Sequence, residues 1–380
     1  MIFLDHASTT PIDPRVRDFL VAELAEPQNS SSVHRHGQKA RAKLDAARRE
    51  MAQLLCVEPS EVVFTASATE ANNLAIRGLA GWARRQGRPL RAASSELEHA
   101  CVRETLAALA VAGQVEVERL AVESGGRVDL GGYSGGKVDL LCLLALQNET
   151  GVVQSLAQAR DFARAHSALW LCDFTQSFGL LDVSVRDSGA DLVSLSSHKL
   201  CGPPGVGVLA GPAVAKLESQ VTGGPQENEH RAGTQPVALI SAFAMAARLA
   251  AEDRAAHRRQ LAELEEVFLG RLGAAGLAYL TNGDPAHRTP GFLNLSFPGM
   301  NGPDLAIALD ARGFSVSSGS ACATGVMEVS ATLAAMYPND PDRARGGLRI
   351  TPGRHTTTQD MESLADALAA LVQRPRSRRT

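Results

Sequence analysis

The sequence is poor in aromatic side chains and lacks two patterns that would indicate other classes of protein. Aromatic residues make up only 4% of its 380 residues, so the core has to be built from Ala, Leu and Val. No apolar run is long enough to cross a bilayer, which argues against a membrane-spanning helix. None of the six cysteines forms a C-x-x-C pair, so no zinc or redox motif of that type is supported.

Strong charge of either sign is also missing. The formal net charge is -3, and the only dense basic stretch is 374–379, which we expect to be a solvated chain end rather than a nucleic-acid site. The first residues, Met1 to His6, carry neither a positive segment nor a cleavage pattern. We therefore expect a cytoplasmic protein without nucleic-acid or membrane partners.

In a reducing compartment most of the cysteines should be free and buried. Cys56, Cys142 and Cys172 lie in apolar runs and fit that expectation. Cys322 does not, because its neighbours from Ser317 to Gly325 are small or polar. An accessible thiol in such a loop is either a nucleophile or an inert surface group.

Strand and helix patterns alternate along most of the chain. Short apolar runs such as 61–65, 115–120 and 138–146 alternate with amphipathic segments such as 37–55 and 154–166. This alternation predicts an α/β fold with a parallel sheet and helices on both faces. A long helix over about 236–272 is expected to lead into a second domain.

A single lysine, Lys199, stands in a polar turn between two apolar strands. It closes the run Ser-x-Ser-Ser-His-Lys from Ser194, and a Gly/Pro loop follows at 202–205. A lysine that attacks a carbonyl needs such a positioned and shielded setting. A solvated loop lysine is the simpler alternative.

Asp173 ends an apolar run that reads as a parallel strand, and ligands bind at that end of open α/β sheets. Pyridoxal 5'-phosphate (PLP) enzymes require a lysine that forms a Schiff base and a carboxylate that keeps the pyridine nitrogen protonated. Asp173 and Lys199 fit these two roles in that order. Alternatively, Asp173 could cap the next helix.

Three further positions could contribute to such a site. The strand-to-helix junction at 66–76 exposes the N–H groups of a first helical turn, which suits a phosphate, although Ser67 and Glu70 also have capping-box spacing. His99 follows a strand and could stack on a flat cofactor or move protons, or be merely structural. Arg349 lies between apolar neighbours on a strand and could bind a carboxylate substrate or pair with a structural acid.

Taken together, these motifs resemble the cysteine desulfurases, PLP enzymes of the class V aminotransferase type. The resemblance runs from Leu4 to about His355 and rests on segments 68–73, 98–99, 148–151, 173–177, 196–199, 232–234 and 317–322. It implies fold type I, with a large domain containing a mostly parallel seven-stranded sheet and a smaller α+β domain. The expected boundaries are 15–250 for the large domain, and 1–14 with 251–380 for the small one.

The resemblance also implies a role for each matching residue. Lys199 would bind PLP covalently, Asp173 would hold its pyridine nitrogen, and His99 would stack on its ring. Gln176 and Asn148 would contact the phenolic oxygen side of the ring. The phosphate would be held by Ala68, Thr69, Ser196 and His198, and by Thr234 reaching into the other subunit of a homodimer.

The resemblance also implies which residues bind the substrate and transfer its sulfur. Arg349, with Asn148, would bind the carboxylate of L-cysteine, and Cys322 would take the substrate sulfur as a persulfide, leaving alanine. The spacing between Cys322 and Arg349 resembles the long-loop group that supplies iron–sulfur scaffolds. The expected partner is thus such a scaffold or another sulfur acceptor. No resident metal is expected, although Cys322 could transiently share an iron–sulfur cluster with a scaffold.

Three departures from the family pattern concern the acceptor rather than the chemistry. Asn228 replaces a usual arginine, Val329 replaces a common proline, and the chain stops soon after its last helix. A selenocysteine lyase or another class V PLP enzyme stays open as an alternative, as does a non-catalytic protein of this fold. The thiol of Cys322 speaks against transamination, and the intact set Lys199, Asp173, His99 and Cys322 speaks against loss of activity.

Overall fold

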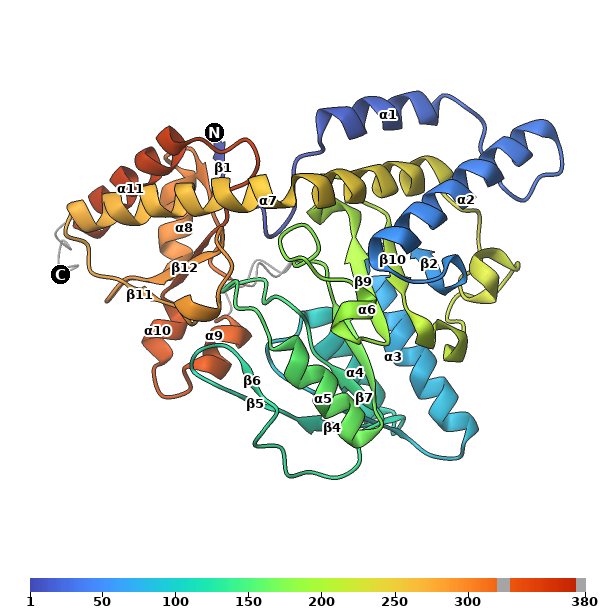
Figure 1. The fold of residues 1–380 in the computed structure, drawn as a ribbon. Helices are drawn as coiled ribbons and strands as arrows, with labels where there is room; N and C mark the ends of the chain where they lie inside the picture. Colours follow the sequence, from blue (N-terminus) through green and yellow to red (C-terminus); the bar gives the residue numbers. More distant parts are fainter. Residues whose placement is uncertain (320–328, 374–380) are drawn as a thin grey trace.

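The computed structural model describes residues 1–319 and 329–373. Its largest sheet has seven strands in the spatial order β2-β10-β9-β8-β7-β3-β4 (Figure 1). Only β10 is antiparallel to its neighbours, so the predicted mostly parallel sheet is confirmed. The strands are β2 (Val62–Thr65), β3 (Leu90–Ser94), β4 (Val115–Arg119), β7 (Leu140–Cys142), β8 (Leu169–Asp173), β9 (Leu192–Ser196) and β10 (Gly207–Ala210).

Helices cover both faces of this sheet because its strands are apolar on both sides. In β8, Trp170 and Cys172 belong to one hydrophobic cluster, whereas Leu171 belongs to another. The first cluster includes side chains from α2, α5 and α7, and the second includes side chains from α3 and α4. These helices are α2 (Arg35–Leu55), α3 (Ala68–Arg85), α4 (Ala100–Val111), α5 (Leu156–His166) and α7 (Val237–Ala274).

The C-terminal part contains an antiparallel three-stranded sheet with its own hydrophobic cluster. Its strands are β11 (Leu280–Thr281), β12 (Leu293–Ser296) and β14 (Gly347–Ile350), and its main helices are α8 (Gly302–Asp310) and α11 (Thr358–Val372). Helix α7 packs against α2 at one end and α11 at the other, and therefore runs along both parts (Figure 1).

The N-terminus is attached to this C-terminal part. Strand β1 (Ile2–Phe3) pairs in parallel with β13 (Phe314–Ser315), after which the chain crosses to α1 (Pro14–Leu24) beside α7 (Figure 1). Other elements are the hairpin β5 (Ala121–Val122) and β6 (Val128–Asp129), and the short α-helices α6 (Val185–Ser188), α9 (Ala331–Met336) and α10 (Pro341–Arg345). A 3-10 turn at Ser197–Lys199 carries the predicted lysine.

Two local expectations were wrong. The strand expected over 138–146 is confined to Leu140–Cys142. Cys56 is exposed rather than buried, because it caps α2 in a left-handed conformation with φ of 56°. Cys142 and Cys172 are buried as expected. Within the described ranges, no helix is long and apolar enough to cross a membrane.

Candidate active site

A cavity of about 370 Å³ lies where the carboxyl ends of β2, β3, β7, β8 and β9 meet the C-terminal part. Parallel strands end at one edge of a sheet, which is why residues far apart in sequence gather there. The predicted residues that line the cavity are Ala68, Thr69, His99, Asn148, Asp173, Gln176, Ser196, His198, Lys199 and Arg349. Thr234 is exposed and is not among the lining residues, and Cys322 lies outside the described residues.

Lys199 is held by the backbone of the N-terminal arm. Its Nζ donates to the carbonyl oxygens of Ala7 and Ser8, the latter at 2.6 Å. Burial, together with the positive charge of Arg349, lowers the pKa of Lys199 from 10.5 to about 8. A fraction of the amine is therefore neutral, and nucleophilic, near neutral pH.

Two donors orient the carboxylate of Asp173. The backbone N–H of Thr175 donates to Oδ1 at 2.8 Å, and Nδ2 of Asn72 donates to Oδ2 at 2.9 Å. The first contact lies within a turn. The alternative that Asp173 caps the next helix is wrong, because that helix, α6, begins at Val185 and Ser184 is its N-cap. No role was predicted for Asn72, although it lies in segment 68–73, on which the resemblance rests; its side chain is 0% exposed on α3.

The first turn of α3 opens onto the cavity at Ala68 and Thr69. Ser67 is the N-cap and accepts from the N–H of Glu70 at 3.1 Å, so the capping interpretation of this junction also holds. Gly207 on β10 lies directly behind the turn. A Cβ there would sit 2.5 Å from the carbonyl carbon of Ser67 and 2.9 Å from the nitrogen of Ala68, so only glycine permits this approach.

Two histidines at the cavity are biased towards their neutral forms. His99 is the N-cap of α4, and its Nδ1 accepts from the N–H of Cys101 at 3.2 Å. Burial lowers the pKa of His99, even though the cavity leaves the ring open on one side. Burial and the charge of Lys199 lower the pKa of His198 to about 4.

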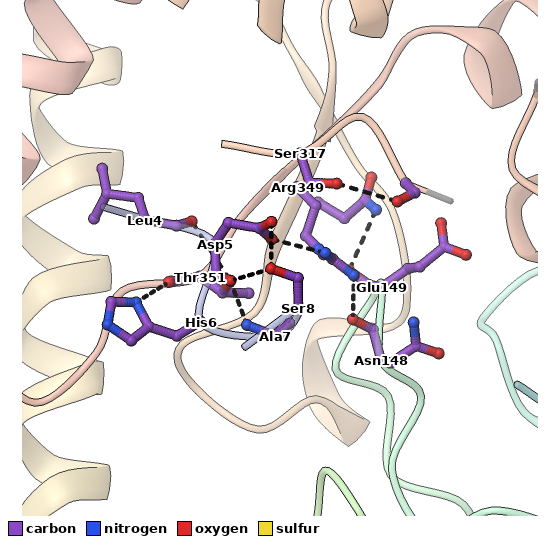
Figure 2. A network of polar contacts seen from close by, with 12 residues as sticks. Leu4, Asp5, His6, Ala7, Ser8, Asn148, Glu149, Ser317, Arg349 and Thr351 are labelled. Carbon is purple, nitrogen blue, oxygen red and sulfur yellow. Dashed lines mark hydrogen bonds and ion pairs between the residues drawn. The ribbon is translucent and has the colours of Figure 1, made fainter. Parts of the chain in front are cut away.

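Arg349, on β14 of the C-terminal part, also lines the cavity, and its side chain is buried, with 4% of the residue exposed. Figure 2 shows its guanidinium between the N-terminal arm and the loop after β7. Nη2 pairs with Oδ1 of Asp5 at 2.7 Å, and Nη1 donates to the carbonyl oxygen of Asn148 at 3.1 Å. Nε is buried without a partner among the described residues. The structural acid expected as an alternative is thus present. Three of the five guanidinium N–H groups, that of Nε among them, have no partner among the described residues.

No sequence pattern assigned a role at the site to residues 4–8, the N-terminal arm. Its Asp5 nevertheless pairs with Arg349, and its Ala7 and Ser8 carbonyl oxygens accept from Lys199. Ser8 donates through Oγ to Oδ2 of Asp5 at 2.6 Å (Figure 2). The carbonyl oxygen of Ala7 accepts from Nε2 of Gln176 at 2.8 Å. Nothing in the local pattern of the arm indicates its contacts with Gln176, Lys199 and Arg349, because these partners lie 169 or more residues away.

Two acidic side chains, Glu227 and Glu70, link the segment before Thr234 to the large sheet and the helices that cover it. Glu227 is 3% exposed, pairs with Arg48 at 2.7 Å, and accepts from the N–H of Phe64 at 2.8 Å. Glu70 pairs with Arg231 at 2.9 Å. Asn228 has a φ of 53°, which suits asparagine better than most residues. Val329 is 43% exposed.

The residues present fit PLP. The amine of Lys199, with its lowered pKa, matches the aldehyde of the cofactor, and the carboxylate of Asp173, held by two donors, matches its ring nitrogen. The open first turn of α3, beside Ser196 and His198, matches its phosphate. In addition, Oγ1 of Thr175 on the cavity wall is buried without a partner among the described residues. Across 1–319 and 329–373, no group of three or more His, Cys, Asp or Glu side chains could hold a metal ion.

Comparisons with known proteins agree with this geometry. The family model for class-V aminotransferases matches residues 2–364. The cysteine desulfurase IscS of Escherichia coli (strain K12 / DH10B) is 35% identical over 385 residues, covering 99% of this chain and 93% of the relative. The chain is a class-V aminotransferase of the cysteine desulfurase family.

Solved structures support the same membership. This desulfurase-family chain superimposes on a NifS-like protein with a TM-score of 0.89 at 26% identity, covering 98% and 99% of the two chains. It also matches a structure of SspA in complex with cysteine, with a TM-score of 0.81 at 27% identity over 94% and 100% of the chains. The predicted family and fold are thus confirmed.

Proposed function

We propose that this cysteine desulfurase uses PLP to convert L-cysteine to alanine, that it holds the sulfur as a persulfide on Cys322, and that it passes it to an acceptor. The observation that carries the proposal is the gathering of an amine, a held carboxylate and a buried guanidinium around one cavity, at Lys199, Asp173 and Arg349. An amino acid substrate presents the matching groups, an amine and a carboxylate.

Each of these side chains has a defined task. Lys199 is the group that would hold the cofactor, and its lowered pKa provides the neutral amine for that bond. When bound, PLP withdraws electrons from the substrate carbons. Asp173, oriented by Asn72 and Thr175, would keep a proton on the ring nitrogen. Arg349, which lines the cavity, would orient the substrate carboxylate through guanidinium N–H groups that have no partner among the described residues.

The transfer of sulfur to Cys322 needs no external oxidant. The Cys322 thiolate attacks the substrate thiol sulfur, the S–S bond forms, and the Cβ–S bond breaks. The carbon receives the electron pair of that bond and one proton, giving alanine, while the sulfur remains as a Cys322 persulfide. Release of sulfide then requires two electrons from an added thiol or from the acceptor.

Further expectations rest on the same proposal. We propose a homodimer in which Thr234 of one subunit helps to bind the phosphate of the other, since Thr234 is exposed on a segment anchored by Glu227. We also propose a cytoplasmic location and an iron–sulfur scaffold or another thio-cofactor pathway as the sulfur acceptor. The two domains would be 15–250 and 1–14 with 251–380, in keeping with separate hydrophobic clusters around α7.

The test measures sulfide and alanine released from L-cysteine in the presence of a thiol reductant. Wild type should produce both, and Cys322→Ala should lose sulfide release while still binding PLP. The matched control is Cys56→Ala, which removes an exposed thiol at the end of α2 and should leave the rate unchanged. Wild-type protein that binds PLP but releases no sulfide would refute the proposal and favour another class V substrate, such as selenocysteine.

A further inference from the structure

A chain of hydrogen bonds connects two cavity groups that come from different strands. It begins at Asp173, at the end of β8, and reaches His99, before α4. Nδ2 of Asn72 lies 2.9 Å from Oδ2 of Asp173 and 3.4 Å from Sγ of Cys101. Sγ of Cys101 in turn lies 3.1 Å from Nδ1 of His99. Both Cys101 and His99 line the cavity, whereas Asn72 is fully buried behind it.

The chemistry of these groups determines which of them donates. A carboxylate can only accept, so the side chain of Asn72 must turn its NH₂ group to Asp173. The second hydrogen of that NH₂ group then points to the sulfur of Cys101, which acts as an acceptor. The hydroxyl of Thr69 also contacts this sulfur. The single hydrogen of the thiol is left to donate to Nδ1 of His99.

Nδ1 of His99 receives a second donor from the backbone. The N–H of Cys101 approaches it at 3.2 Å, as expected when an N-cap side chain serves its helix. A ring nitrogen that accepts carries no proton, so a neutral His99 must carry its proton on Nε2. The ring then presents an N–H donor, and not a base, to the cavity.

We propose that Cys101 is a positioning residue, which, supported by Asn72, keeps the proton of His99 on Nε2. This goes beyond the role of His99 as a ring that covers the cofactor, and only its kinetic consequence rests on the proposed function. Two observations agree with it. Burial lowers the pKa of His99, and burial together with the charge of Asp173 raises the pKa of Cys101 to about 12, so the thiol keeps its hydrogen.

The test uses PLP-free protein with 15N-labelled histidine, in which nuclear magnetic resonance reads the protonation of both ring nitrogens. The His99 signals are assigned by their loss in His99→Gln. Wild type should show the Nε2–H form. Cys101→Ala removes the donor that favours neutral His99 and should raise its proton affinity about 2- to 10-fold, the range that one net hydrogen bond contributes.

Cys101→Ser retains an O–H donor and should restore the wild-type titration, which separates a lost hydrogen bond from a damaged fold. Cys56→Ala is the thiol control. The other charged groups that act on His99 are Asp173 on β8, Lys199 after β9 and Arg103 on α4, and all three remain in these variants. In the PLP-loaded enzyme, Cys101→Ala should lower kcat for cysteine by a similar factor at unchanged KM.

The sign of the titration shift decides the question. If Nδ1 carried the proton and the sulfur accepted it, Cys101→Ala would lower the proton affinity of His99 instead of raising it. That result, or no shift, would overturn the proposal. Failure of sulfide release with the expected titration would contradict the proposed function alone, because the titration is measured without cofactor or substrate.

Discussion

Replacing Arg349 with lysine keeps the positive charge but removes the planar array of donors. The guanidinium uses Nη2 for Asp5, Nη1 for the carbonyl oxygen of Asn148, and has Nε free. A lysine has one nitrogen, and the nearby carboxylate of Asp5 would claim it first. The substrate carboxylate would then lose its N–H donor while a positive charge remains close by.

The expected loss follows from the burial of Arg349. A hydrogen bond to a charged group contributes about 1.5–3 kcal/mol, which corresponds to a roughly 10- to 150-fold change in an equilibrium constant. We therefore expect Arg349→Lys to raise KM for L-cysteine by about 10- to 150-fold, with a smaller change in kcat. The assay is initial-rate alanine formation over a range of cysteine concentrations, after PLP loading is verified by absorbance.

Arg343→Lys is the matched control. Arg343 also sits in a polar network, donating to Oδ1 of Asn282 at 2.9 Å and to the carbonyl oxygen of Thr281 at 2.7 Å, but it does not line the cavity. This variant should lower the melting temperature and leave KM unchanged. A folded, PLP-loaded Arg349→Lys enzyme with wild-type KM would show that Arg349 serves only the structural pair with Asp5.

Three other predictions follow from the same cavity. Gly207→Ala should raise the dissociation constant for PLP, because the new Cβ displaces the first turn of α3. The rate of PLP binding to the apo-protein should rise with pH through about 8 as Lys199 becomes neutral, and absorbance at increasing pH measures it. Glu98 has a pKa raised from 4.5 to about 8 by burial, so it remains protonated in the folded protein after it ionises in the unfolded chain. The contribution of Glu98 to the free energy of unfolding is therefore complete below pH 4.5 and is lost as pH rises to about 8. The free energy of unfolding of Glu98→Gln, measured with urea at several pH values, should lack this decline.

Each of these has its own control. Gly270→Ala, on α7 with no atom within 4 Å of the added Cβ, should leave PLP binding unchanged. For the second prediction, Asp5→Asn should move the midpoint of the curve of PLP-binding rate against pH to lower pH, since the charge of Asp5 raises the pKa of Lys199. Equal slopes of stability against pH for wild type and Glu98→Gln would show that Glu98 is ionised in the folded protein.

Local sequence patterns were enough to identify the groups at the strand ends. Lys199 and Asp173 each follow an apolar run, and the strand-to-helix order of the chain places such positions at one edge of a parallel sheet. The same applies to His99 and to the first turn of α3. The structure brings these residues to one cavity, because each position depends on a few neighbouring residues and on the general handedness and direction of βα units.

Contacts between distant segments could not be read in this way. The arm residues Asp5 and Ala7 reach Arg349 and Lys199 only because β1 pairs with β13, and neither the pairing nor its register has a local signal. No sequence pattern singled out Cys101, and its contact with Asn72 depends on how α3 and α4 pack.

The sequence by itself determined the fold class and the order of the elements, and its local patterns indicated Lys199, Asp173, His99, Arg349 and the first turn of α3, because strand ends and helix starts are local properties of the chain. The other predicted cavity residues came only from the resemblance to the family. Only the tertiary structure decided which of these groups have partners: the pairing of Asp5 with Arg349, the carbonyls around Lys199, and the link from Asp173 to His99. Hydrogen bonding and pKa depend on distances of a few ångströms across the fold, and those distances are set by packing rather than by the local pattern.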